Sequence, residues 1–383
     1  MSEWKKVSLS EMGIVSRGKS KHRPRNDARL YGGRYPFIQT GDIGAAGLYV
    51  TDYSQTYNEE GLAQSKLWEK NTLCITIAAN IADTALLAFP ACFPDSIMGF
   101  VPYKDVSNVM YVKYCFDILK KDCQQISQGT AQDNLSWKKL STIKFPCPPL
   151  EVQNRIAAIL SRYDSLIENY QKQIKLLEEV AQRLYKEWFV DLHFPGHENT
   201  KIVDGVPEGW EEKSIMEVFD FKYGKILPTK DFVKDGPIPV YGASKQIGRY
   251  TKANCFEPKV LIGSRGNAGF VHRTIEDETY VTNNSFIVEP CANYGYLKMP
   301  FIFESFKVLD FVAICTGAAQ PQLTLNSISS LKYIVPMKDL IISYCDITTC
   351  YFSKIALAYK QINLLTEARD RLLPKLMSGE IDV

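Results

Sequence analysis

The feature that most constrains the fold of this chain is an internal repeat. The segment "ISQGTAQDNLSWKKLSTIKFPCPPLE" (126–151) resembles "ICTGAAQPQLTLNSISSLKYIVPMKD" (314–339), and identical residues recur at a constant separation of 188 positions. The same separation relates "KQI" at 172–174 to "KQI" at 360–362. Nearer the start of each half the separation is 206, as for Trp4 and Trp210. The sequence therefore predicts a duplicated unit whose copies differ by about 18 residues in their middles and match in their rear parts.

The shared rear part predicts a long helix in each copy. Apolar residues alternate in steps of four and three over more than four heptads, which is the spacing of a coiled-coil seam. The prolines of "CPPLE" (147–151) mark the start, and a helix from about 151 to 188 would be roughly 55 Å long. In the second copy Arg369 interrupts the seam, and Pro374 with Gly379 predicts the end. The seam residues are Ile156, Leu160, Tyr163, Ile167, Tyr170, Ile174, Leu177, Ala181, Leu184 and Trp188 in the first copy, and Tyr344, Thr348, Tyr351, Ile355, Ala358, Ile362, Leu365, Leu372 and Leu376 in the second.

A helix with a single apolar stripe needs a partner to cover it. The simplest partner is the other copy, and antiparallel pairing would relate the two halves by a pseudo-twofold axis. The predicted fold class is therefore α+β, with two front domains separated by two long helices that form an antiparallel coiled coil. Such a rod could span DNA half-sites, which lie about 34–36 Å apart. The seam would look the same if it served only for packing.

The front parts are rich in short strands and polar loops. The pair "LCITIAANIADTALLAF" (73–89) and "VLIGSRGNAGFVHR" (260–273) reads as matching strands, followed by "FPDSIMGFVP" (93–102) and "YVTNNSFIVEP" (280–290). The apolar run 73–93 is long enough to suggest a membrane span, but Asn80 and Asp83 lie at its middle. Because a central Asp costs about 2.5–3.5 kcal/mol on insertion scales, a buried strand-turn-strand is the better interpretation.

The first front part opens with a concentration of basic residues. Seven Lys or Arg residues fall within positions 17–34, opposed there by Asp27 alone. Such a cluster suits a loop that follows DNA phosphates, although a merely solvated basic loop would have the same composition. The candidates are Arg17, Lys19, Lys21, Arg23, Arg25, Arg29 and Arg34.

The second front part offers both cations and amides. Arg and Asn side chains pair bidentately with guanine and adenine edges, so these residue types suit base reading. The matching loops "GTAQDN" (129–134) and "GAAQPQ" (317–322) also place Gln132 and Gln320 in equivalent positions, for DNA contact or for capping a turn. The candidates are Lys222, Lys225, Ser244, Lys245, Arg249, Arg265, Asn267, Asn283 and Asn284.

Residues 13–20, "GIVSRGKS", match G-x-x-x-x-G-K-[ST], the pattern of a nucleotide-phosphate loop. The equivalent segment "FDFKYGKIL" (219–227) keeps only the Gly-Lys pair. A phosphate loop should also follow a buried strand and open a helix, yet Pro24 stands amid charge where the helix should begin. We expect a turn glycine followed by a basic loop.

Composition narrows the protein class further. The net charge is only +2, so nucleic-acid binding would have to come from local patches. The ten cysteines form no C-x-x-C pair, which favours reduced thiols in a cytoplasmic protein. The opening "MSEWKKVSLSEMG" has no apolar region, so no secretory signal is expected. The histidines, His22, His193, His197 and His272, are too scattered to predict a catalytic set, and no metal-ligand spacing occurs.

Several phrases resemble the specificity subunits of type I restriction-modification systems. They are "VPEGWE" (206–211), "RLYKEWFVD" (183–191), "RLLPKLMSGEI" (371–381) and "GTAQDNLSWKKLSTIKFPCPPLEVQ" (129–153). "IQTGDI" (38–43) and "IGSRGNAGFV" (262–271) are similar to phrases of the target-recognition domains, which adds Gln39 and Thr40 to the candidate DNA-contacting residues. The resemblance covers nearly the whole chain in the order of the family.

The resemblance implies a division of labour. Residues 1–148 would form the first target-recognition domain, 149–190 the first long spacer helix, 191–336 a linker and the second recognition domain, and 337–383 the second long helix and tail. Each recognition domain would read half of a bipartite DNA target, and the helices would set the spacing and dock two methyltransferase subunits. Those partners would use S-adenosylmethionine to methylate adenine N6, and two restriction (motor and nuclease) subunits using ATP with Mg could join them. This chain would bind no cofactor itself.

Two other functions stay open at this point. The chain could be a coiled-coil scaffold whose front domains bind protein, in which case DNA binding would lack a steep salt dependence. It could also be a nucleotide hydrolase acting through residues 13–20, in which case ATP would bind and Lys19→Ala would weaken that binding. The resemblance and the absence of an N-P-P-[FY] methylase motif favour a non-catalytic DNA-specificity subunit.

Overall fold

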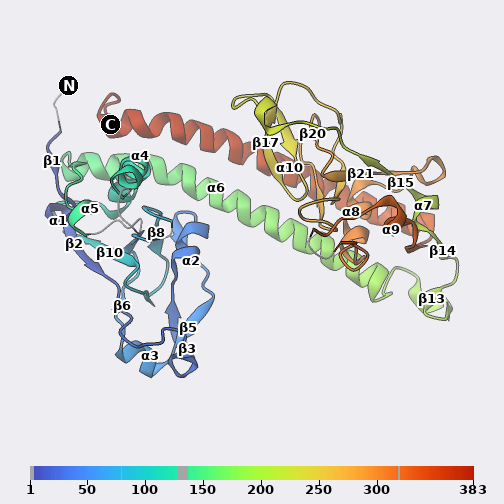
Figure 1. Cartoon of the computed structure of the whole chain (residues 1–383), viewed down its shortest axis with the longest axis horizontal. Coiled ribbons are helices and arrows are strands. Elements are labelled where there is room, and N and C mark those ends of the chain that lie inside the picture. The colour runs from blue at the N-terminus through green and yellow to red at the C-terminus, as the bar shows by residue number, and fades with distance from the viewer. Residues whose placement is uncertain (1–3, 79, 128–136, 318–319) are drawn as a thin grey trace. The chain divides into compact units, whose positions relative to one another are not determined.

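The computed structural model describes residues 4–78, 80–127, 137–317 and 320–383. Contacts divide the chain into two units, the first made of Met1–Asn169 and Gln361–Val383 and the second of Tyr170–Lys360. The two long helices, α6 (Leu150–Tyr185, green) and α10 (Lys338–Ser378, red), each contribute a part to both units (Figure 1). The front domains are thus completed by segments distant in sequence.

The first unit contains two main sheets. The five-stranded sheet has the order β2 (Gly13–Arg17), β10 (Ile97–Pro102), β7 (Leu73–Thr76), β8 (Thr84–Leu87) and β4 (Tyr49–Val50). The four-stranded sheet has the order β5 (Gln55–Tyr57), β3 (Tyr31–Phe37), β9 (Ala91–Cys92) and β6 (Leu67–Trp68), and β1 (Lys6–Val7) pairs with β11 (Phe145–Pro146). Strands β7 and β8 are antiparallel and largely buried, which confirms the strand-turn-strand prediction for the apolar run.

Helices of the first unit cover one face of the five-stranded sheet. Its core joins Leu73 and Phe100 from the sheet to Phe116 of a helix, Ile156 of α6 and Leu376 of α10. Strands β3 and β5 lie further from α6 than β2 and β10 do (Figure 1). The helices that precede α6 are α1 (Leu9–Met12), α2 (Thr40–Ala45), α3 (Glu59–Ala63), α4 (Val109–Ser127) and α5 (Trp137–Leu140), with a 3-10 turn at Ala28–Leu30.

The second unit repeats this plan with shorter connections. Its four-stranded sheet has the order β15 (Phe219–Tyr223), β21 (Ser285–Pro290), β18 (Val260–Gly263) and β19 (Val271–Arg273). Beside it are β17 (Gln246–Tyr250), β16 (Ile238–Tyr241) and β20 (Tyr280–Val281), and the pairs β14 (Glu211–Ser214) with β22 (Lys332–Val335) and β12 (Ile202–Val203) with β13 (Val206–Pro207). The helices are α7 (Ile215–Val218), α8 (Met299–Lys307) and α9 (Leu325–Ser329), with 3-10 turns at His197–Asn199, Thr229–Asp231 and Ala292–Tyr294.

Strand registers confirm the duplication. In the first unit Met98 pairs with Arg17, and in the second Phe286 pairs with Tyr223. Met98 and Phe286 are 188 positions apart, and Arg17 and Tyr223 are 206 positions apart. These are the two separations found in the sequence. The pairs Val7 with Phe145 and Lys213 with Tyr333 obey the same two separations. The copies therefore share a backbone framework, residue for residue, along these strands.

The long helices contact each other within each unit. In the first unit Asp164 of α6 pairs with Arg369 of α10 at 2.7 Å, and in the second the Tyr344 hydroxyl donates to the Ala181 carbonyl at 3.1 Å. The early part of α6 thus meets the late part of α10, and the late part of α6 meets the early part of α10. This is antiparallel pairing, as the sequence predicts.

The predicted seam positions differ in burial. Those that are buried are Ile156, Leu160, Ile167, Ile174, Ala181, Trp188, Tyr344, Thr348, Ile355, Ala358 and Leu376. Those that are half-buried are Tyr163, Tyr170, Leu177, Leu184, Tyr351, Ile362, Leu365, Arg369 and Leu372.

Among the described helices, α10 alone is long and apolar enough to cross a membrane. The core helix of a soluble protein can have the same length and composition.

The prediction that Pro374 and Gly379 mark the end of the second helix is confirmed at Gly379, but the helix does not break at Pro374. Helix α10 passes through Pro374 and continues to Ser378, where Gly379 follows with φ of +72°. A proline so close to the end removes one backbone hydrogen bond, while Leu376 and Met377 are buried in the core of the first unit and hold the last turn in place.

The aromatic residues at the end of α6 pack inside the second unit. A π-helical turn (Lys186–Val190) follows Tyr185 and places Phe189 against Phe301 of α8, with ring centroids 5.1 Å apart. Tyr185 meets Tyr344 of α10 edge to face at 5.9 Å. These rings belong to the core of the second unit, so they anchor α6 to α8 and α10 there.

Candidate nucleic-acid interface

Four connections of the first unit meet at one edge of its sheets, which we call the first loop edge. They are the end of β2, the β3–α2 connection, the β7–β8 turn and the β9–β10 turn. Backbone hydrogen bonds join them: Gly18 N to Ile97 O (2.9 Å), Lys19 N to Phe93 O (3.1 Å), Ile38 N to Cys92 O (2.8 Å) and Ile77 N to Ser96 O (3.0 Å). The edge is therefore built by the main chain, whatever side chains it presents.

Most predicted basic residues of the first unit are exposed on or beside this edge, but their partners differ. Arg25 pairs with Asp95 of the β9–β10 turn at 2.5 Å. Arg29 pairs with Asp27, and its guanidinium holds the pKa of that carboxyl well below the usual range. Arg34 pairs with Glu59 at 3.0 Å. The remaining exposed candidates are Arg17, Lys19, Lys21 and Arg23, of which Arg23 donates to the carbonyls of Ser20 and His22.

Gln39 and Thr40 begin α2 at the same edge. Gln39 is the N-cap residue, and its amide Nε2 donates to Gln55 Oε1 at 2.8 Å. Both residues are half-buried. They contribute to the shape of the edge through this cap as well as through any contact they make.

The phosphate-loop motif at residues 13–20 does not form a phosphate loop. Residues Gly13–Arg17 are strand β2, which follows the short helix α1 and pairs with β10. The backbone N–H groups of Gly18 and Lys19, which a phosphate would need, donate instead to carbonyls of the β9–β10 region. A Cβ at Gly18 would lie 2.3 Å from the Phe93 carbonyl oxygen, so glycine is required for close packing.

The second unit forms an equivalent edge, the second loop edge. Gly224 N donates to Ser285 O (3.1 Å) and Lys225 N to Val281 O (3.0 Å), at the two repeat separations from the bonds of Gly18 and Lys19. The β18–β19 turn joins it through Ser264 N and Asn284 O at 2.7 Å. The structure thereby brings together seven predicted residues: Lys225, Ser244, Lys245, Arg265, Asn267, Asn283 and Asn284.

The side chains of this edge suit base reading. Arg265 and Asn267 are exposed on the β18–β19 turn, where Gly266 and Gly269 both have φ of +82°. Lys225, Lys245 and Asn284 are also exposed, whereas Ser244 and Asn283 are half-buried. Cations and amides in one place are the combination that contacts phosphates and base edges.

Lys222 and Arg249, also predicted from the sequence, are engaged elsewhere. Lys222 lies 2.7 Å from Glu289 and 3.1 Å from Asp220, and the bond to Glu289 raises the lysine's pKa. Arg249 donates to the Pro237 carbonyl at 2.8 Å and to the Gly236 carbonyl. Their contacts stabilise the β15–β21 surface and the β16–β17 hairpin.

The matching glutamine loops are described only in part. Gln132 lies outside the described residues, as does Ala131. In the second unit Gln320 is exposed, and Thr316 and Gln322 exchange backbone hydrogen bonds of 2.9 and 2.8 Å. Leu323 N donates to Ser264 O, so this loop abuts the second loop edge.

A buried histidine lies behind the second loop edge. His272 Nε2 is 3.5 Å from Ser285 Oγ, and burial lowers the His272 pKa to about 4. Both side chains are buried and Ser285 donates to the Gly242 carbonyl, so the pair is part of the core and has no access for a substrate.

Among the described residues, no group of three or more His, Cys, Asp or Glu side chains could hold a metal ion. The ten cysteines are free thiols.

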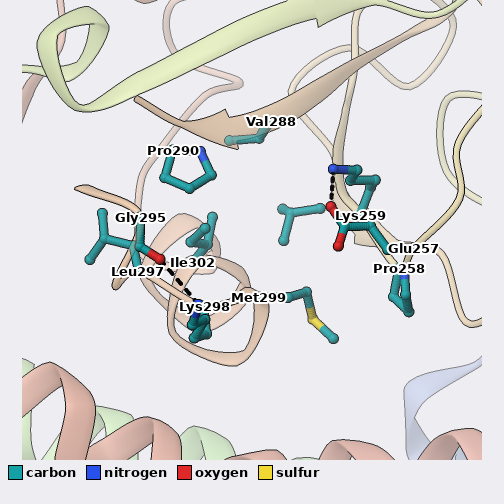
Figure 2. A pocket seen from close by; sticks show the side chains of 11 residues that line it. Glu257, Pro258, Lys259, Val288, Pro290, Gly295, Leu297, Lys298, Met299 and Ile302 are labelled. Carbon is teal, nitrogen blue, oxygen red and sulfur yellow. Dashed lines mark hydrogen bonds and ion pairs between the residues drawn. The ribbon is translucent and has the colours of Figure 1, made fainter. Parts of the chain in front are cut away.

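A pocket of about 240 Å³ lies at the opposite ends of β18 and β21 (Figure 2). Val288, Met299 and Ile302 line its apolar side. Its two ammonium groups are already engaged, since Lys259 pairs with Glu257 at 2.6 Å and Lys298 donates to the Gly295 carbonyl. The pocket therefore offers no free cation to an anionic ligand and is separate from the second loop edge.

Comparisons with known proteins agree with this architecture. The family model "Type I restriction modification DNA specificity domain" matches residues 1–179 and 207–341. The type I restriction enzyme MjaIX specificity subunit of Methanocaldococcus jannaschii is 24% identical over 416 residues, covering 100% of this chain and 94% of that protein. The HindI specificity subunit of Haemophilus influenzae is 22% identical over 477 residues and covers both chains completely.

A solved structure supports the fold independently. The crystal structure of the type I restriction-modification S subunit from Mycoplasma genitalium superimposes with a TM-score of 0.65 at 20% identity, covering 97% of this chain and 96% of that one. The family model matches a segment in each copy of the repeat and spans most of the chain. The resemblance inferred from sequence phrases is therefore confirmed, and this chain belongs to the type I restriction-modification DNA specificity family.

Proposed function

We propose that this chain is the DNA-reading subunit of a type I restriction-modification complex, in which each unit contacts one half of a bipartite target. The observation that carries the proposal is the pair of loop edges, which share the backbone bonds of Gly18 and Lys19 with Gly224 and Lys225 and present exposed cations and amides. Such edges can contact phosphates and base edges, as DNA recognition requires.

Catalysis belongs to the partners in this proposal. Two methyltransferase subunits dock on this chain and use S-adenosylmethionine to methylate adenine N6. Where a restriction subunit accompanies the system, two of them join and use ATP with Mg. The chain works in the cytoplasm, where its cysteines stay reduced, and binds no cofactor of its own. The relatives are named as specificity subunits, which supports this division.

The decisive experiment maps methylated adenines genome-wide after co-expression of the chain with its methyltransferase. A bipartite motif is expected. Replacing residues 1–148 with those of a relative should change one half of the motif and leave the other half and the spacer unchanged. A motif unaffected by the exchange would contradict the proposal.

Binding measurements separate base readers from phosphate contacts. Arg265→Ala or Asn267→Ala should cost about 1–3 kcal/mol at one position of the target. Arg23→Ala should instead weaken binding to all sequences. If every variant weakened all sequences equally, base reading by these residues would be excluded, and binding without a steep salt dependence would favour a protein-binding scaffold.

A further inference from the structure

Two lysines from separate segments of the chain lie near each other beside the first loop edge. Lys19 follows β2, and Lys66 precedes β6. Two hydrogen bonds tie the segments together: Ser65 Oγ donates to the Lys19 carbonyl at 2.7 Å, and His22 N donates to Gln64 Oε1 at 3.0 Å. Lys66 was not among the residues singled out from the sequence, because nothing in the primary structure links it to the basic segment 17–34.

The Lys66 ammonium group lies over an aromatic ring. Its Nζ lies 3.5 Å from the centroid of the Trp68 ring, and Trp68 is stacked on Phe93 with centroids 4.8 Å apart. Phe93 also accepts the backbone N–H of Lys19. The backbone of Lys19 and, through Trp68, the ammonium group of Lys66 therefore both lie next to Phe93 of the β9–β10 turn.

The two charges are uncompensated within the described part of the chain. No carboxylate there lies within 4.0 Å of Lys19 or Lys66, in contrast to Arg25, Arg29 and Arg34, each of which has one. Burial and the positive charge of Lys19 lower the pKa of Lys66. Like charges close together repel each other, and an anion between them would remove that cost.

We propose that Lys19 and Lys66 together bind one backbone phosphate of the DNA, so that they form a phosphodiester site of the first unit. The site rests on the proposed function and names two residues that perform part of it. Gln64 Nε2 is a buried donor with no hydrogen-bond partner among the described residues, and it lies in the same segment. This unsatisfied donor is two residues from Lys66 in the sequence.

The second unit does not repeat the site. Lys225 corresponds to Lys19, but the position equivalent to Lys66, 188 residues later, is Asn254. The Asn254 amide donates to the Val281 carbonyl at 2.9 Å and accepts from Val281 N at 2.8 Å. Its hydrogen-bonding groups are used by the main chain, so the two-lysine site is confined to the first unit.

The test measures DNA affinity as a function of salt, using the chain in complex with its methyltransferase subunits and a mixed-sequence DNA duplex. The variants are Lys19→Met, Lys66→Met and both together. Methionine keeps the aliphatic stem of Lys66 over Trp68 and removes only the charge. Lys104→Met is the matched control, since Lys104 is exposed and follows β10 at the end away from the loop edge.

Each single variant should weaken binding to all sequences and reduce the slope of log K against log salt by about 1, whereas the control should not. If holding the phosphate requires both lysines, losing either one loses the whole contact, so the double variant should lower the slope no further than each single variant. Lys66→Arg keeps the positive charge and should keep the slope of the unmodified complex. A Lys66→Met slope equal to that of Lys104→Met would overturn the site, and a double variant that loses about 2 would show separate contacts. If the unmodified complex bound DNA without salt dependence, the proposed function would itself fail.

Discussion

The seam residue Arg369 allows a sharp test of how the helices pair in the first unit. Arg369 interrupts an apolar stripe, so sequence pattern alone would predict that leucine at this position stabilises the coiled coil. The structure predicts the reverse. Arg369 Nη1 lies 2.7 Å from Asp164, whose side chain is only 8% exposed and also accepts the Tyr114 hydroxyl at 2.5 Å. Removing the guanidinium would leave a buried carboxylate with one neutral donor.

The size of the effect follows from this geometry. Removing one partner of a buried ion pair costs about 3–5 kcal/mol. Arg369 is 27% exposed, so water can reach part of the gap, and Tyr114 remains as a donor. We therefore expect Arg369→Leu to lower the free energy of unfolding by about 2–3 kcal/mol. Arg369→Leu combined with Asp164→Leu should recover part of this loss, because no charge is then left unpaired, while the buried Tyr114 hydroxyl loses its acceptor.

Urea unfolding followed by hydrogen exchange in α4 and the first part of α6 measures this change where it occurs. Arg371→Leu provides the control. Arg371 lies two residues after Arg369 on the same helix and forms an exposed ion pair with Glu367. That control should change stability by about 0.5 kcal/mol or less. If Arg369→Leu alone were neutral or stabilising, the carboxylate would have to be hydrated and the reasoning from burial would be refuted.

Further predictions concern the framework of the two edges. Gly18→Ala and Gly224→Ala should each destabilise their own unit by about 1–3 kcal/mol in thermal unfolding, because a Cβ would lie 2.3 Å from a carbonyl oxygen in both cases. The control Gly41→Ala should be tolerated, because the space around Gly41 is open. The pKa of His272 is lowered to about 4 by burial, against about 6.5 when unfolded, so the unfolded chain binds more protons between these values and stability falls as the pH drops through that range. We expect the free energy of unfolding of the second unit, measured in urea, to fall by about 2 kcal/mol between pH 7 and pH 5, and to fall by less in His272→Phe. An equal fall in both proteins would show that other groups are responsible.

Much of the fold could be predicted because its signals are periodic or repeated. The steps of four and three from Ile156 predict α6, and the constant separations predict that the copies share strand registers. Pro374 and Gly379 together predict the end of α10, but Pro374, which breaks helices in general, lies here inside a last turn held by Leu376 and Met377. Packing against the core overrides the local preference of the proline.

Less of the candidate site could be predicted, because long-range partners decide what a charged residue can do. Arg25 and Lys19 look alike in the basic segment, yet Arg25 pairs with Asp95, seventy positions away, and Lys19 lies near the positive charge of Lys66. Arg249 looks like a base reader but donates to two backbone carbonyls. Residue type alone cannot distinguish a paired cation from a free one, since the pairing depends on which strands lie side by side.

The construction of the loop edges explains how one framework can present different chemistry in its two copies. The bonds that hold both edges run between backbone groups, as at Gly18 and Gly224, so side chains there can change without loss of the edge. The two copies have in fact diverged at these positions: the first edge is crowded with cations such as Lys19 and Lys66, and the second is richer in amides such as Asn267 and Asn284. Cations contact phosphates of any sequence, whereas amides discriminate among base edges. Through these side chains, the first unit should therefore supply more of the salt-dependent DNA affinity, and the second unit more of the discrimination among bases. Both units do so on equivalent hydrogen-bonded strands.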